Sequence, residues 1–225
     1  MKVKNLKKTY DGKNVLSVEE FDFIPGKIYA IVGANGSGKS TFLKLLSGDI
    51  KSDIKSESFE AIGQKLCYMP QKNYAFKMST LKNILLTSSN IKADTPYALE
   101  LMKDLKIDHL ATQQASKLSG GETARMALCR IMLSNASIIL LDEPTAAMDI
   151  ESTVLSEELI RNYNRKNHAT VIMVTHSINQ AKRLSDELIF MKDGHIIEHG
   201  PTTCVLSSPV KEETKEFLDF FSAEI

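Results

Sequence analysis

The sequence lacks an excess of charge of either sign. Lysine and arginine together number 28, aspartate and glutamate also number 28, and the formal net charge is zero. A protein whose main partner is a nucleic-acid backbone usually presents a basic surface. The charge balance therefore argues against nucleic acid as the main partner and leaves room only for local basic patches.

Cysteine is scarce. The three cysteines, Cys67, Cys129 and Cys204, are widely spaced and odd in number, which argues against a disulfide framework. Cys67 and Cys129 lie in apolar segments, so we predict that both are buried, reduced thiols. No group of cysteine and histidine has the spacing of metal ligands.

Long hydrophobic runs are also lacking. The longest apolar strings, "SIILL" and "TVIMV", are the size of strands, whereas a membrane-spanning helix needs about 20 residues. The first residues, "MKVKNLKKTYDGKNV", are charged and have no apolar segment of the kind that a signal peptide carries. We expect a soluble, cytoplasmic chain, which would need a partner to supply any membrane-spanning part.

What the sequence does contain is an alternation of strand-like and helix-like segments over 225 residues, enough for one domain with a subdomain. The apolar runs "KIYAIVG", "SIILLDEP" and "ATVIMVTH" are bounded by polar residues, as is typical of central strands of a parallel sheet covered on both faces. Further strands and helices are predicted within residues 1–25 (a hairpin), 39–48, 65–71, 152–167, 187–200 (a second hairpin) and 211–221.

The alternation is interrupted between residues 76 and 135, where apolar residues recur at spacings of three and four. This spacing predicts a helical subdomain inserted into an α/β core. We therefore expect a single domain over residues 1–225, with a core of mostly parallel sheet formed by residues 1–75 and 136–225.

A phosphate-binding loop is indicated by "GANGSGKST", residues 33–41, which follows a predicted strand and opens a helix. Its glycines allow backbone N–H groups to surround phosphate oxygens, next to the positive end of the helix dipole. In this motif Lys39 reaches the β- and γ-phosphates and Ser40 offers its hydroxyl to Mg²⁺. The alternative is a glycine-rich turn with a surface lysine. Such a turn would not need every residue of the motif, so the presence of the complete motif favours a phosphate-binding loop.

Polar residues follow three of the other predicted strands. Asp142 and Glu143 end "IILLDEP", at the edge where an open sheet binds its ligand. Asp142 is suited to hold Mg²⁺ and Glu143 to act as the general base for an attacking water. His176 ends "VTH" and can donate to a γ-phosphate, and Gln71 can offer a carbonyl oxygen to Mg²⁺. Standing alone, the acidic pair could equally be a solvated strand end. A lone His176 would more often be a capping or packing residue, and Gln71 by itself indicates almost nothing.

The stretch "LSGGE" precedes a predicted helix. Ser119 and Glu122 fit a capping box, in which each side chain accepts from a backbone N–H of the first turn. A cap does not need Gly120 and Gly121, each of which costs about 1 kcal/mol in a helix relative to alanine. We interpret the glycines as allowing backbone N–H groups to approach an anion. Capping and anion binding could also alternate.

Taken in order, "GANGSGKST", "YMPQ", "LSGGE", "IILLDEP", "AAMD" and "VTH" resemble the nucleotide-binding subunits of ABC transporters over nearly the whole chain. The resemblance implies a P-loop NTPase core with a mostly parallel sheet, an N-terminal antiparallel β subdomain and a helical insertion. It also implies ATP and Mg²⁺ as cofactors and ATP hydrolysis as the activity. The helical insertion would dock onto a membrane subunit.

The resemblance assigns further roles position by position. Tyr10 matches the aromatic residue that stacks on adenine, although a tyrosine that packs in the hairpin is the alternative. Asp149 matches the acid of a loop that crosses between two subunits, and Ser119, Gly120, Gly121 and Glu122 match the signature segment. The implied nucleotide-binding residues of the phosphate loop are Gly33, Asn35, Gly36, Ser37, Gly38, Lys39, Ser40 and Thr41. The implied Mg²⁺ ligands are Ser40, Gln71 and Asp142, and the implied catalytic residues are Lys39, Glu143 and His176.

Some positions depart from the family pattern. Thr123 and Ala124 stand where the family often has a polar pair ending in glutamine, so any contact of that glutamine is missing. Ala146 lacks the hydroxyl of the commoner "SALD". The stretch 48–71 looks short, which predicts a trimmed antiparallel sheet.

One chain cannot easily wrap a second phosphate site around the nucleotide that its own loop holds, whereas an isologous dimer places each signature segment over the partner's ATP. The expected partners are a second copy or a second cassette, integral membrane permease subunits and, indirectly, a solute-binding protein, at the cytoplasmic face of the membrane. The tail "THSINQAKRLSDELIFMKDGHIIEHG" is similar to cassettes of tungstate-type oxyanion importers. Cassettes of polar amino acid, phosphate or metal importers, an exporter, a soluble ABC-type ATPase and a non-catalytic scaffold are the alternatives.

Overall fold

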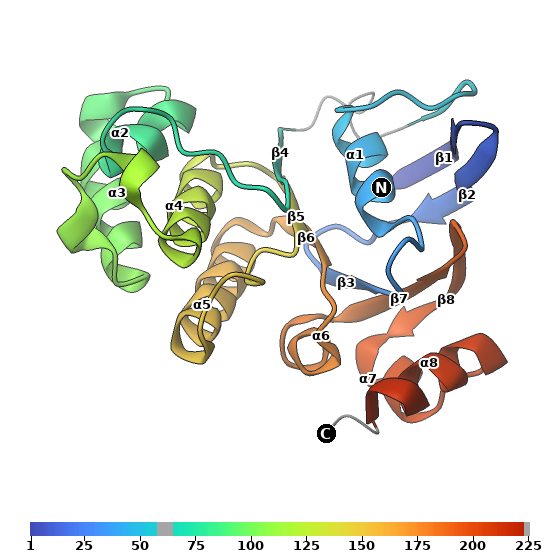
Figure 1. Cartoon of the computed structure of the whole chain (residues 1–225). Coiled ribbons are helices and arrows are strands. Elements are labelled where there is room, and N and C mark those ends of the chain that lie inside the picture. The colour runs from blue at the N-terminus through green and yellow to red at the C-terminus, as the bar shows by residue number, and fades with distance from the viewer. Residues whose placement is uncertain (58–64, 223–225) are drawn as a thin grey trace.

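The computed structural model of the chain describes residues 1–57 and 65–222 (Figure 1). Within these residues the main sheet has six strands in the order β4-β5-β6-β3-β7-β8, all parallel to their neighbours except β8. The strands are β3 (Ile28–Val32), β4 (Leu66–Met69), β5 (Ile138–Asp142), β6 (Thr170–Val174), β7 (Glu187–Lys192) and β8 (His195–Pro201). The predicted α/β fold with a mostly parallel sheet is confirmed.

The N-terminal hairpin forms a separate antiparallel sheet. Its strands β1 (Lys2–Tyr10) and β2 (Lys13–Asp22) are joined by a tight turn at Asp11 and Gly12, both in the left-handed region of backbone space. Lys4 also bridges Glu57 in an antiparallel manner. The prediction of a trimmed sheet over residues 48–71 falls partly on residues 58–64, which lie outside the described residues.

The two faces of the central strands enter different parts of the core because successive side chains of a strand point to opposite faces. Ile138 and Leu140 of β5 pack with the hairpin and with α1 (Lys39–Ser47), which lies between the two sheets. Ile139 and Leu141 pack on the other face with α4 (Gly120–Leu133) and α5 (Ile150–Asn167). Both strand faces are therefore covered, as their uninterrupted apolar runs predict.

The residues between β4 and β5 are helical and lie at the side of the molecule opposite the hairpin (Figure 1). They comprise α2 (Thr80–Ile84), α3 (Ile91–Asp104), the start of α4 at Gly120, and short 3₁₀ turns at Leu85–Thr87, Asp108–Leu110 and Ala115–Lys117. Their apolar residues belong to the same core cluster as one face of β5. The exact division into core and subdomain at residues 75 and 136 stays a prediction.

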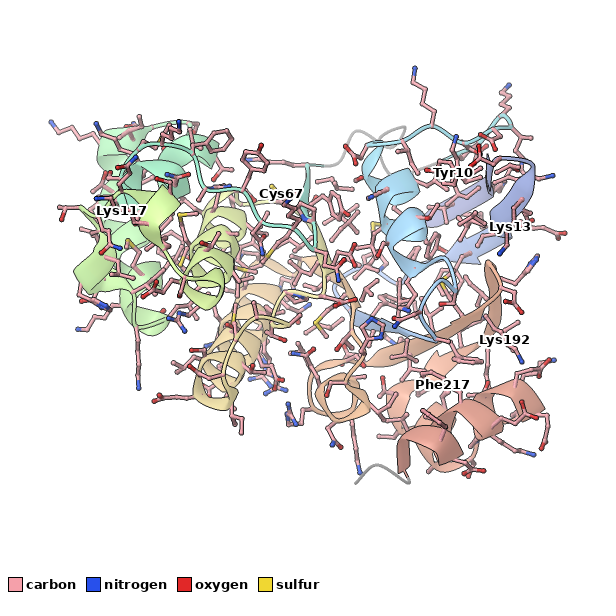
Figure 2. All side chains as sticks on the ribbon, in the orientation of Figure 1. Tyr10, Lys13, Cys67, Lys117, Lys192 and Phe217 are labelled. Atoms are coloured by element: carbon pink, nitrogen blue, oxygen red, sulfur yellow. The ribbon has the colours of Figure 1, made fainter. Side chains whose placement is uncertain are left out.

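The C-terminal part covers the edge of the sheet formed by β7 and β8. Three helices, α6 (Ile178–Leu184), α7 (Thr202–Ser207) and α8 (Glu212–Ser222), contribute to a third cluster with Val32 and Phe190. The ring of Phe217 on α8 lies 4.9 Å from that of Phe190 (Figure 2). Only α8 and the two strands were predicted from the sequence, and α6 and α7 were not.

The cysteines are free thiols, and one of the two burial predictions was wrong. Cys129 is buried in α4, but Cys67 is only half-buried on β4, which is the edge strand of the main sheet within residues 1–57 and 65–222. Among the described residues, no helix combines the length and the apolar character that crossing a membrane requires.

Candidate active site

The candidate site lies where the parallel strands end, because their carboxyl ends meet at one edge of the sheet. β3 leads into the glycine-rich loop that starts at Gly33. β5 ends at Asp142 and is followed by Glu143, while its neighbour β6 is followed by Thr175 and His176. The sheet thus brings together residues that are more than a hundred positions apart in the sequence.

The glycine-rich loop is held in shape by backbone that only glycine adopts easily. Gly38, the N-cap of α1, has a φ of 99°. A Cβ atom on Gly38 would also lie 2.8 Å from the carbonyl oxygen of Val15 in the hairpin. No side chain of the described residues makes a capping hydrogen bond at Gly38, so the first N–H groups of the helix remain available to a ligand. This arrangement suits an anion bound at the positive end of the helix.

Lys39 lies inside this loop and is 6% exposed. Its Nζ donates to the carbonyl oxygens of Gly33 at 2.7 Å and Ala34 at 2.9 Å. Burial lowers the pKa of Lys39, while the carboxylates of Glu143 and Asp142 oppose that shift. The ammonium group of Lys39 is the main positive charge of the loop. Because it is incompletely solvated, an anionic ligand would stabilise its charged form.

Asp142 is 2% exposed and faces the start of α1. The hydroxyl of Ser40 donates to its Oδ1 at 3.1 Å, and the hydroxyl of Tyr68 on β4 lies 3.5 Å from its Oδ2. Burial raises the pKa of Asp142, and the hydrogen bond from Ser40 opposes this shift.

A magnesium ion fits the chemistry of this donor set. The hydroxyl of Ser40 and the carboxylate of Asp142 are adjacent oxygen donors, and Gln71 borders the same cavity as Ser40. Mg²⁺ prefers carboxylate, hydroxyl and amide oxygens, and its charge would relieve the cost of burying the ionised Asp142.

Glu143 and His176 form a close pair across the ends of β5 and β6. The Nε2 atom of His176 lies 2.7 Å from Oε1 of Glu143. The Glu143 side chain is 14% exposed and that of His176 is 38% exposed. Glu143 has a φ of 50°, an uncommon backbone conformation for a residue other than glycine. A carboxylate held in this way can accept a proton, and the imidazole can orient it.

One cavity of about 240 Å³ is bordered by most of these residues, but not by Gly33 or Asp142. Its lining comprises Val15, Asn35, Gly36, Ser37, Gly38, Lys39, Ser40, Thr41, Gln71, Glu143 and His176. A hydroxyl, an ammonium group, a carboxylate and an imidazole thus converge on a space beside a helix N-terminus. The arrangement can bind a phosphate chain and activate a water molecule next to it.

The other predicted site residues lie outside this lining. Tyr10, at the end of β1, is 47% exposed, and Nζ of Lys8 lies 5.5 Å from the centre of its ring. Lys117, two residues before Ser119, lies across the molecule from Tyr10 (Figure 2). The signature segment is therefore remote from the hairpin of its own chain.

The signature segment starts α4 with the predicted capping box, which is confirmed. Glu122 N donates to the Ser119 hydroxyl at 3.3 Å, and Ser119 N donates to the Glu122 carboxylate at 2.7 Å. This backbone hydrogen bond lowers the pKa of Glu122. A contact within the same chain explains why residue 121 is a glycine. A Cβ atom on Gly121 would lie 2.9 Å from the carbonyl oxygen of Ala147.

Asp149 serves as the N-cap of α5, a role that was not predicted. Its carboxylate accepts from the backbone N–H of Ser152 at 2.7 Å, and this bond lowers the pKa of Asp149. Two residues of the cavity region were also missed: Val15, which borders the cavity from the hairpin, and Tyr68, which touches Asp142. The alternation of β2 could have pointed to Val15, whereas Tyr68 carries no signal apart from its place three residues before Gln71.

Comparison with known proteins places these features in one family. A family model described as ABC transporter matches residues 16–146. The tungstate uptake system ATP-binding protein TupC of Peptoclostridium acidaminophilum is 39% identical over 205 residues, which cover 87% of this chain and 96% of that protein. A probable amino-acid import ATP-binding protein, YxeO of Bacillus subtilis, is 32% identical over 96% of this chain and 95% of its own length.

A solved structure also resembles this chain along most of its length. It is the dimer of an ATP-binding cassette in a post-hydrolysis state, bound to ADP and Pi. The TM-score is 0.80 at 26% identity, and the match covers 89% of this chain and 98% of that one.

Proposed function

This chain belongs to the ABC transporter family, and from that premise we propose that it powers import of tungstate or a similar oxyanion through separate membrane subunits. It is an ATP-binding subunit and an ATPase. The observation that carries the proposed chemistry is the convergence of the 33–41 loop with the Glu143–His176 pair on one cavity.

The loop residues bind the phosphates of ATP. Backbone N–H groups of residues 36–41 and the ammonium of Lys39 face the β- and γ-phosphates. Ser40, Asp142 and Gln71 would hold Mg²⁺, which neutralises charge on the phosphate oxygens when it is bound. Tyr10 stacks on the adenine, for which its half-exposed ring is available.

Glu143 acts as the general base. Its carboxylate accepts the proton of the attacking water. His176, whose Nε2 lies beside that carboxylate in the ligand-free chain, donates toward the γ-phosphate when ATP is bound. Lys39 stabilises the negative charge that is transferred to the oxygen between the β- and γ-phosphates.

The site is completed by a second copy of the chain in an isologous dimer. Ser119, Gly120, Gly121 and Glu122 lie outside the cavity of their own chain, so they contribute to hydrolysis only by facing the ATP of another subunit. Asp149 crosses to the partner in the same interface. The similarity to a solved cassette dimer supports this proposal.

The membrane permease docks on the helical side of the molecule. Large apolar side chains are exposed there, with Tyr74 at 68% and Ile91 at 63%. Phe76, Leu86 and Leu99 are also exposed on this side. The chain then works at the cytoplasmic face of the membrane, and a solute-binding protein delivers the substrate to the permease.

Tungstate is proposed because TupC is more similar to this chain than YxeO is, at 39% against 32% identity. Import of a polar amino acid is the second candidate and is favoured by the similarity to YxeO, which covers more of this chain. Reconstitution with the permease and the binding protein distinguishes the two. Tungstate, but not an amino acid, should stimulate ATP hydrolysis, and the opposite result would replace the first candidate by the second.

The dimer is tested by dilution. The monomer should bind ATP but hydrolyse it very slowly, so specific activity should rise with the concentration of the chain until dimers predominate. Ser119→Arg should abolish this activity and leave ATP binding by the monomer unchanged. Specific activity that is constant under conditions in which the chain stays monomeric would contradict the proposal.

A further inference from the structure

Gln180, on the short helix α6, is a polar residue that is only 2% exposed. Its side-chain amide is fully engaged. The hydroxyl of Thr175 donates to its Oε1 at 2.7 Å, and its Nε2 donates to the hydroxyl of Thr145 at 2.9 Å. A buried amide that bridges two hydroxyl groups fixes both of them relative to one helix.

The two threonines belong to the two loops of the candidate active site. Thr145 lies two residues after Glu143, and Thr175 immediately precedes His176. The Glu143–His176 contact of 2.7 Å depends on the relative position of these loops. Gln180 is therefore the shared hydrogen-bonding partner of the loop after β5 and the loop after β6.

The bridge is anchored on a third element. Nε2 of Gln180 also lies 3.3 Å from Oε1 of Glu157 on α5, which is 4% exposed. Arg183 of α6 binds both oxygens of Glu157, through Nε at 3.0 Å and Nη2 at 2.7 Å. This two-bond ion pair joins α6 to α5 and holds the Gln180 amide in one orientation.

Hydrogen bonds contribute to holding the two loops here, and one of them runs from Glu143 N to the carbonyl oxygen of Val174 at 3.1 Å. A cavity of about 280 Å³ borders Glu143, His176, both threonines and Gln180. Among the described residues, the side chains on this side leave open space next to both loops. In addition, the left-handed backbone of Glu143 is a conformation that the surroundings must maintain.

We propose that Gln180 is a positioning residue for ATP hydrolysis, which keeps Glu143 and His176 in register by bridging Thr145 and Thr175. The inference rests on the roles proposed above for Glu143 and His176. Gln180 acts through the two threonines and does not touch ATP. Its removal should affect the chemical step more than the binding of ATP.

The test uses the full-length chain with Mg²⁺ and ATP. Gln180→Leu removes the amide hydrogen bonds to Thr145, Thr175 and Glu157 while it keeps an apolar filling of similar size. We expect kcat to fall on the order of 10–100-fold, because small misplacements of reacting groups are costly. KM for ATP should change by less than about 3-fold, since the phosphate loop is untouched.

The matched control is Ser185→Ala, at the C-cap position directly after α6. It removes a hydrogen bond of 2.8 Å to the carbonyl oxygen of Ala181 and another of 2.8 Å to the hydroxyl of Thr202, neither of which belongs to the site. Its kcat should stay within about 2-fold of the unmodified chain. If Gln180→Leu lowers the melting temperature as Ser185→Ala does and keeps an equal kcat, the proposal is overturned and Gln180 only stabilises the fold.

A second variant covers the case in which Gln180→Leu does not fold. Thr145→Val removes one of the two bridging hydrogen bonds, in a half-buried loop, and should lower kcat in the same manner. Thr145→Ser keeps the hydroxyl and should retain the kcat of the unmodified chain. In the double variant Gln180→Leu/Thr145→Val, the losses should overlap, because both changes break the same bond. Fully multiplicative losses would refute the bridge.

Glu143→Gln separates this inference from the proposed function. If Glu143→Gln hydrolyses ATP at the unmodified rate, the role of Glu143 is wrong whatever Gln180 does. If Glu143→Gln is inactive while the Gln180 and Thr145 variants retain kcat, only the positioning role fails.

Discussion

Substituting alanine for the two glycines at the start of α4 should affect stability differently at the two positions. Gly120 and Gly121 are the first two residues of the helix, and alanine there gains up to about 1 kcal/mol of helix propensity. At Gly120 the added Cβ would lie 3.7 Å from Cβ of Ala147, an ordinary contact. At Gly121 it would lie 2.9 Å from the carbonyl oxygen of Ala147, and backbone would have to move.

The magnitude follows from the difference between the two sites. Because the propensity gain is nearly the same at both, it cancels, and the remaining difference is the cost of overpacking, about 1–3 kcal/mol. For a domain of this size each kcal/mol corresponds to about 2–4 °C in melting temperature. Gly120→Ala should therefore melt at or above the temperature of the unmodified chain, and Gly121→Ala several degrees below Gly120→Ala.

Thermal unfolding of the ligand-free monomer, followed by circular dichroism, measures the order of the two variants. A Gly121→Ala variant that is as stable as Gly120→Ala would refute the reasoning from the Ala147 contact. The ATPase assay then adds the functional part. If backbone N–H groups of this turn face a partner's ATP, Gly120→Ala should lose hydrolysis although it gains stability.

The remaining predictions concern charged residues. Burial raises the pKa of Asp142, so its ionised form destabilises the fold, and the penalty grows as pH rises from the ordinary carboxyl range through the raised pKa. Asp142→Asn should thus raise the melting temperature of the ligand-free chain at pH 7 and abolish ATP hydrolysis. The gain in melting temperature should shrink at acidic pH, and a gain that is independent of pH would contradict the effect of burial. The backbone N–H of Ser119 lowers the pKa of Glu122, so its capping contribution is present above the ordinary glutamate pKa and is lost as pH falls through the lowered value. Glu122→Ala should lower stability at pH 7 by about 0.3–1.5 kcal/mol in chemical denaturation. It should also alter the affinity for ATP, and no change in either would sink the idea that capping and anion binding alternate.

Much of the fold could be predicted because its central strands are buried on both faces. The runs that became β3, β5 and β6 are apolar throughout, and the hairpins carry clear turn residues at Gly12 and Gly194. Helices α6 and α7 span only 7 and 6 residues, too few for a periodic pattern to be distinguished. The burial of Cys67 was predicted wrongly because the sequence of β4 is apolar, like that of a central strand. Nothing in that sequence indicates that β4 lies at the edge of the sheet.

The candidate site was predictable where a local motif carries the chemistry, as in residues 33–41. It was not predictable where contacts depend on the order of the strands. The Glu143–His176 pair requires β5 and β6 to be neighbours, and the bridge through Gln180 requires a short helix to return to both loops. Gly121 shows a third limit. Its cost to the helix was visible in the sequence, but the contact with Ala147 that gives it a structural reason was not.

The most direct test of the account is hydrolysis by Glu143→Gln. The substitution keeps the size of the side chain and removes the carboxylate that accepts the proton of water. Phosphate release with Mg²⁺ and ATP should fall by about 10²–10⁴-fold, and gel filtration in ATP should show a dimer that retains the nucleotide. Phosphate release at the rate of the unmodified chain would contradict the central claim that Glu143 is the base of an ATP site shared by two subunits.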